Sequence, residues 1–78
     1  MTIRLKLADL VAATLELPVE QVHDRLSSDT SESWDSVHHL MLILAVEDAF
    51  GIHFDEAELL SLTNFRDLLA TVETRAAR

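Results

Sequence analysis

The chain has 78 residues, of which 49% are hydrophobic, and it contains one Gly and one Pro. A chain of this length forms one domain with a small core, which leaves no room for a deep catalytic cleft. The composition also excludes a disordered chain and an all-β fold rich in turns. We therefore expect a single all-α domain over residues 1–78 without catalytic activity of its own.

The absence of cysteine excludes disulfides, thiolate metal sites and cysteine nucleophiles. No long apolar signal region follows the N-terminus, and the longest apolar run, residues 40–46, is too short to span a bilayer. We therefore expect a cytoplasmic protein without a membrane span.

The net charge of −8 is concentrated in the middle of the chain. All six basic residues lie outside residues 26–65, whereas eight of the acidic residues lie inside that segment. Such a surface repels nucleic acid and favours partner proteins with basic docking surfaces, although acidity can also serve only to keep a small protein in solution.

The first predicted helix covers residues 3–15, because its apolar residues recur at helical spacing until Pro18 ends the pattern. A long ordered loop follows over residues 18–35. Three apolar side chains in the loop are expected to hold it against the core, namely Val19, Val22 and Leu26. Ordering is required because so small a domain does not accommodate a loose segment of this length.

A second helix is predicted from Asp35-Ser36 to Phe50, since Gly51 suits the left-handed residue after a helix end. Asp55 can cap a short helix that ends near Leu60, and Thr63 or Asn64 can cap a last helix. The last helix would bury Phe65, Leu68, Leu69, Val72 and Ala76. Together these elements predict a small up-and-down four-helix bundle, with three main helices, one short helix and a long loop between the first two.

The second predicted helix is apolar on nearly all sides. With about 100° per residue, Leu40, Ile43, Leu44 and Glu47 fall on or near the side of Ser36. A short chain does not bury every side of one helix, so part of the set Leu40, Met41 and Leu44 is expected to stay exposed, rimmed by Glu47 and Asp48. Such a patch would be a docking surface; the alternative is that all these residues are core.

Ser36 lies at the predicted start of this helix, where a phosphodiester on its hydroxyl would meet free backbone N–H groups and the positive end of the helix dipole. Asp and Ser are also ordinary capping residues, so the position alone leaves both roles open. Trp34 is expected to anchor the loop in the core, and contact with a partner is its second possible role.

The stretch from Trp34-Asp35-Ser36 through Glu47-Asp48-Ala49-Phe50-Gly51-Ile52 resembles the acyl carrier protein family. In that family Asp-Ser and an aliphatic residue open the second helix, which closes with acidic residues, Phe and often Gly-Ile. The short acidic segment 55–60 and Thr63-Asn64-Phe65 extend the resemblance along the chain.

The resemblance implies a monomer in which Ser36 bears a covalent 4′-phosphopantetheine arm, with Asp35 as the acidic neighbour that the phosphopantetheinyl transferase recognises. Acyl groups would be carried as thioesters for a loading enzyme and downstream acyl-processing enzymes. Their binding surface would comprise Trp34, Val37, Leu40, Met41, Leu44, Glu47, Asp48, Asp55 and Glu56.

Trp34, His38, His39 and Met41 occupy positions where the family commonly has Gly or acidic residues. This difference indicates a dedicated fatty-acid, polyketide or other secondary-metabolite pathway. Two alternatives remain open: an aminoacyl or peptidyl carrier, and an unmodified acidic interaction module in which Ser36 is only a helix cap.

The histidines could also suggest a metal site or, with Asp35 and Ser36, a catalytic triad. Adjacent His38 and His39 point about 100° apart on a helix and do not readily share an ion. An exposed helix start also lacks the oxyanion hole that a triad needs. We expect no metal, and histidines that face solvent or a partner.

Overall fold

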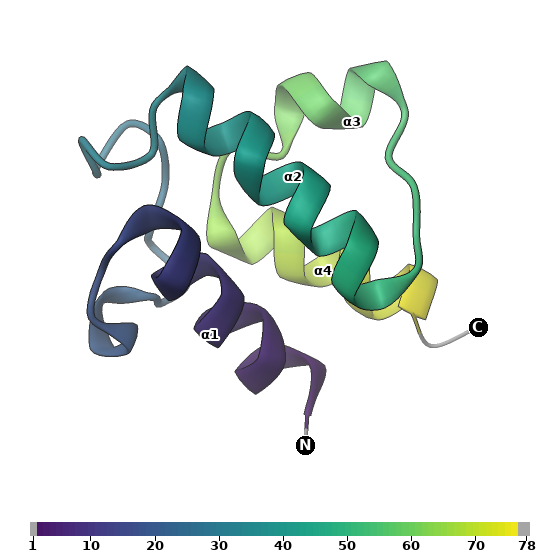
Figure 1. Cartoon of the computed structure of the whole chain (residues 1–78), viewed down its shortest axis with the longest axis horizontal. Coiled ribbons are helices and arrows are strands. Elements are labelled where there is room, and N and C mark those ends of the chain that lie inside the picture. Colours follow the sequence, from purple (N-terminus) through teal and green to yellow (C-terminus); the bar gives the residue numbers. More distant parts are fainter. Residues whose placement is uncertain (1, 77–78) are drawn as a thin grey trace.

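The structure is a computed structural model, which describes residues 2–76. Four helices follow in order: α1 (Ile3–Leu15), α2 (Ser36–Phe50), the short α3 (Glu56–Ser61) and α4 (Phe65–Ala76). A 3₁₀ turn, Val19–Gln21, lies in the loop between α1 and α2. The predicted all-α four-helix bundle with one short helix is thereby confirmed. In Figure 1, α2 crosses the molecule between α1 and α3, and α1 packs against both α2 and α4.

The ends of the helices follow from local side chains. Thr2 caps α1, Asp35 caps α2, and Asp55 caps α3 in a capping box with Glu58. Asn64 Oδ1 accepts the backbone N–H of Asp67, which identifies Asn64 rather than Thr63 as the cap of α4. Each cap supplies an acceptor to an N–H group that has none inside the helix.

The first two helices both end in a left-handed residue. Gly51 has φ 66° at the end of α2, as predicted, and Glu16 has φ 57° at the end of α1. The chain therefore turns away from α1 before it reaches Pro18, which the sequence had suggested as the end of the pattern.

The buried side chains form one cluster, to which all the main helices contribute. Leu7, Val11, Leu42, Val46, Phe65, Leu68 and Val72 are each 0% exposed. The predicted core of α4 is confirmed except that Ala76 is only half-buried, and Ile3, Leu10 and Thr14 of the predicted α1 face are also half-buried.

The loop between α1 and α2 is ordered by backbone pairing with the turn between α3 and α4. Ser28 N donates to Thr63 O at 2.8 Å, and Phe65 N donates to Leu26 O at 2.9 Å. Leu26 is buried and Val22 half-buried, as predicted. The expectation for Val19 was wrong: it is 44% exposed, and it lies in the 3₁₀ turn, none of whose residues is buried.

Candidate functional site

The start of α2 is organised by Asp35. Its Oδ1 accepts the backbone N–H of His38 at 2.9 Å and lies 2.8 Å from His38 Nδ1. The pKa of Asp35 is lowered, first by the hydrogen bond from the His38 backbone and then by the one from its ring. An ionised carboxylate therefore stands at the positive end of the helix dipole, directly before Ser36.

Ser36 is the first residue of α2, and its side chain is exposed. Among residues 2–76 its hydroxyl has no hydrogen-bond partner, whereas Asp35 takes the capping position. The suggestion that Ser36 serves as the helix cap was therefore wrong, because the preceding carboxylate already does so. Within the described residues, the fold therefore makes no use of the Ser36 hydroxyl.

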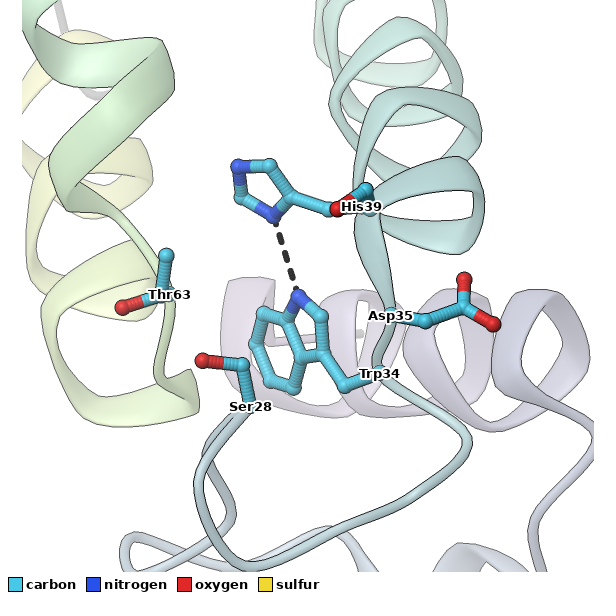
Figure 2. A pocket seen from close by; sticks show the side chains of 6 residues that line it. Ser28, Trp34, Asp35, His39 and Thr63 are labelled. Atoms are coloured by element: carbon cyan, nitrogen blue, oxygen red, sulfur yellow. Dashed lines mark hydrogen bonds between the residues drawn. The ribbon is translucent and has the colours of Figure 1, made fainter.

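Trp34 is 2% exposed and anchors the loop, which confirms its predicted structural role. Its Nε1 donates to His39 Nδ1 at 3.0 Å, and the two rings stack with their centroids 6.2 Å apart. Figure 2 shows the indole ring and the Asp35 carboxylate on opposite sides of the chain. Because its ring is buried, Trp34 does not belong to the exposed surface with which the sequence grouped it.

His39 is a structural residue, contrary to the expectation that the histidines face solvent or a partner. Its Nε2 lies 2.6 Å from Leu59 O in α3, while Nδ1 accepts from Trp34. The sequence does hold a signal for this role. His39 precedes the buried Leu42 and Val46 by three and seven positions, so it lies on their side of the helix.

The apolar patch predicted on α2 is exposed. Its members and their exposed fractions are Val37 (65%), Leu40 (52%), Met41 (51%) and Leu44 (65%). At about 100° per residue these four positions fall on one side of α2, opposite the buried Leu42 and Val46. Leaving four large apolar side chains in water has no benefit for folding.

The acidic residues predicted to surround this patch divide into two kinds. Glu47 is half-buried and accepts the backbone N–H of Phe54 at 2.8 Å, and Asp55 caps α3, so both are used by the fold. Asp48 and Glu56 are exposed. Glu47 and Asp55 nevertheless lie beside the patch as well, because they line one cavity together with Leu40 and Leu44.

Two cavities adjoin these residues. One, of about 290 Å³, is lined by Ser28, Trp34, Asp35, Ser36, His39 and Thr63. The other, of about 270 Å³, lies between α2 and α3 and includes Leu40, Ile43, Leu44, Phe54 and Leu59. Only the first has Ser36 in its wall.

No helix within residues 2–76 combines the length and apolar character needed to cross a membrane. In the same part of the chain, no three or more His, Asp or Glu side chains gather as a metal-binding group would require.

The fold and the site define a small all-α bundle that presents an exposed serine, preceded by an ionised aspartate, at the start of its second helix. The chain is similar to acyl carrier protein 3 of Ralstonia nicotianae, with 29% identity over 68 residues that cover 87% of this chain and 78% of the relative. No family model matches the chain. The similarity over most of the chain confirms the resemblance to the acyl carrier protein family.

Proposed function

We propose that this protein is an acyl carrier protein, in which a 4′-phosphopantetheine arm on Ser36 carries acyl groups as thioesters. The observation that carries the proposal is the exposed Ser36 hydroxyl, unused by the fold and located in the first turn of α2. The similarity to a curated acyl carrier protein supports the same role.

The residues at the start of α2 fit such a group. Ser36 Oγ would attack the β-phosphorus of coenzyme A, so that a new P–O bond forms while the phosphoanhydride bond breaks and adenosine 3′,5′-bisphosphate leaves. The serine proton passes to a base of the transferase. N–H groups of the first turn and the helix dipole favour the anionic phosphodiester at this position.

Because the chain has no cysteine, the arm supplies the only thiol, on which acyl groups are held. Cargo chemistry then belongs to partner enzymes, and the carrier itself is not catalytic. We assign their docking to the exposed Val37, Leu40, Met41 and Leu44, with Asp48 and Glu56 as charges that basic partner surfaces recognise. The departures from the family pattern at Trp34, His38, His39 and Met41 favour a dedicated fatty-acid, polyketide or other secondary-metabolite pathway over a general one.

The test is the intact mass of the protein after incubation with coenzyme A, magnesium and a broad-specificity phosphopantetheinyl transferase. Ser36→Ala removes the nucleophile, and Ser33→Ala is the matched control in the same loop. We expect one added phosphopantetheine in the natural chain and in Ser33→Ala, and none in Ser36→Ala. Circular dichroism checks that each variant is helical. A folded natural chain that takes up no arm from several transferases would refute the proposal and favour an unmodified interaction module.

A further inference from the structure

The short helix α3 is attached to the bundle mainly by its edges. None of its six residues is buried, and only Leu59 packs against the core, as a half-buried side chain. Two polar contacts come from neighbouring helices: Arg75 of α4 is hydrogen-bonded to Glu58, and His39 of α2 lies with Nε2 at 2.6 Å from Leu59 O. The position of α3 therefore depends on side-chain hydrogen bonds that do not belong to α3 itself.

The contact from His39 requires one particular form of the imidazole ring. Trp34 Nε1 carries a hydrogen and is only a donor, so His39 Nδ1, at 3.0 Å, must be the acceptor (Figure 2). The carbonyl of Leu59 is only an acceptor, so the ring proton lies on Nε2 and is donated to that oxygen. The arrangement therefore contains neutral His39 in its Nε2–H form, bonded to the loop on one side and to α3 on the other.

A second proton on His39 is incompatible with this arrangement. An imidazolium ring donates from both nitrogens, so Nδ1–H would face the indole N–H of Trp34 with no acceptor between them. The Trp34 ring is 2% exposed, which leaves its N–H without water as a replacement partner. Histidine ordinarily takes up this proton near about pH 6.5, so mild acidification is expected to break the link.

The surrounding charges do not hold a protonated ring in place. Within residues 2–76, no carboxylate forms a hydrogen bond or ion pair with His39. Asp35 lines the same cavity, but its carboxylate lies on the opposite side of the chain from the indole ring, as Figure 2 shows. Of the acids on α3, Glu58 is paired with an arginine of α4 and Glu56 lines the separate cavity between α2 and α3. The turn before α4 contributes the uncharged Thr63.

We infer that His39 is a pH-sensitive latch, which holds α3 against α2 in its neutral form and releases α3 when protonated. The latched form excludes the proton and the released form accepts it, so the latch is fully stable above about pH 6.5 and weakens as pH falls below that value. Leu59 faces Leu40 and Leu44 across one cavity, so release of α3 changes the surface that a partner meets. The inference does not depend on a modification of Ser36.

The first measurement is the tautomer of His39 in the unmodified protein, from nitrogen-15 resonances of the imidazole ring at pH 8. We expect the Nε2–H form. The second is hydrogen exchange at the amides of Leu59 and Leu62, which donate to Asp55 O and Glu58 O within and just after α3. Their protection factors, corrected for the direct effect of pH on exchange, should fall about tenfold between about pH 7.5 and about pH 5.5, because the released state gains that much population one unit below the ordinary histidine value.

Two variants assign the effect to His39. His39→Gln keeps an amide donor for Leu59 O but does not titrate, so the fall in protection should disappear. His38→Gln is the matched control at the adjacent position of α2, where the ring contacts Asp35 and not α3, and it should keep the full effect. An Nδ1–H tautomer at pH 8 would overturn the inference, as would constant protection in the natural chain or an equal fall in His39→Gln. Intact mass after the transferase reaction tests the proposed function separately, so the two can fail independently.

Discussion

The guanidinium of Arg75, in the last turn of α4, is hydrogen-bonded to the carboxylate of Glu58 in α3. The same arginine donates to His53 O at 2.8 Å, and its guanidinium lies 5.6 Å from the centre of the Phe54 ring. One side chain thereby connects the last turn of α4 to the short helix α3 and to the segment before it.

This relationship predicts a dependence of stability on pH. The pKa of Glu58 is lowered from its ordinary value of 4.5, first by the Arg75 hydrogen bond and then by the Asp55 backbone N–H. A carboxyl with a lower pKa in the folded state stabilises the fold above its unfolded pKa, and this contribution is lost as pH falls through the folded pKa. Urea unfolding should therefore show stability declining below about pH 4.5, and Glu58→Gln should flatten the decline. An unchanged pH profile in that variant would contradict this assignment.

Asp35 combines a capping role with a charge, and two substitutions separate them. Asp35→Asn keeps an acceptor for His38 N and should unfold close to the natural chain, whereas Asp35→Ala should unfold at lower urea concentration. If the transferase recognises the charge, both variants should load more slowly than the natural chain in the intact-mass assay. Normal loading of folded Asp35→Asn would show that the charge is not recognised.

Leu42 and Leu44 lie two positions apart on α2, with 0% and 65% exposure. Leu42→Ala should lower the free energy of unfolding by about 3 kcal/mol, because it removes a fully buried side chain and leaves a cavity. Leu44→Ala should change it by less than about 0.5 kcal/mol, as is usual for surface positions. Chemical denaturation of the two variants gives the comparison, and equal losses would mean that the exposed patch is part of the core.

The left-handed residues at the ends of α1 and α2 predict opposite changes in stability: removing glycine at position 51 should destabilise the fold, and introducing glycine at position 16 should stabilise it. No neighbouring atom lies within 4 Å of a Cβ placed at Gly51, so Gly51→Ala causes no clash with the rest of the protein. The substitution does force alanine into a left-handed backbone conformation, with φ 66°. That conformation should cost about 1 kcal/mol in the free energy of unfolding. Glu16→Gly should stabilise the chain by a few tenths of a kcal/mol, because Glu16 already bears the strained conformation. Thermal unfolding measures both changes, and a stabilising Gly51→Ala would contradict the geometry.

The exposed patch predicts a selective loss of function. Leu44→Arg should leave the fold intact but lower the kcat/KM of arm transfer, because a cation on the patch repels the basic surface of a partner. Leu5→Arg is the matched control: it is 57% exposed and lies on α1, outside the patch. Equal effects of the two substitutions would argue against a docking role for the patch.

Most of the fold could be predicted because the helices are bounded by residues that act locally. The prediction placed α1 at residues 3–15 and α2 from Ser36 to Phe50, since the helical spacing of apolar residues ends before Pro18, and Asp35 and Gly51 mark the ends of α2 through their own chemistry. The exposure of Leu40, Met41 and Leu44 also followed from the amount of surface that a short chain is able to bury.

The site was less predictable where it depends on contacts between distant segments. Neither the His39 link to Leu59 nor the role of Glu47 as acceptor for Phe54 follows from the helical pattern of α2 alone. The backbone hydrogen bond from Ser28 to Thr63 depends on how the loop meets the turn before α4. The spacing of residues along the sequence indicated which of them share a helix face. Only the packed bundle shows which residues of different helices and loops contact one another.

The backbone pairing between residues 26–28 and 63–65 also bears on the order of folding. Helical turns close over a few residues, whereas this link requires closure of a long loop, whose entropic cost must be met before the contact contributes. We expect the helices to form first and this link later. During synthesis, the wall beside Ser36 then becomes complete only after the start of α4 has left the ribosome, so a shortened nascent chain would present its serine without the adjoining cavity.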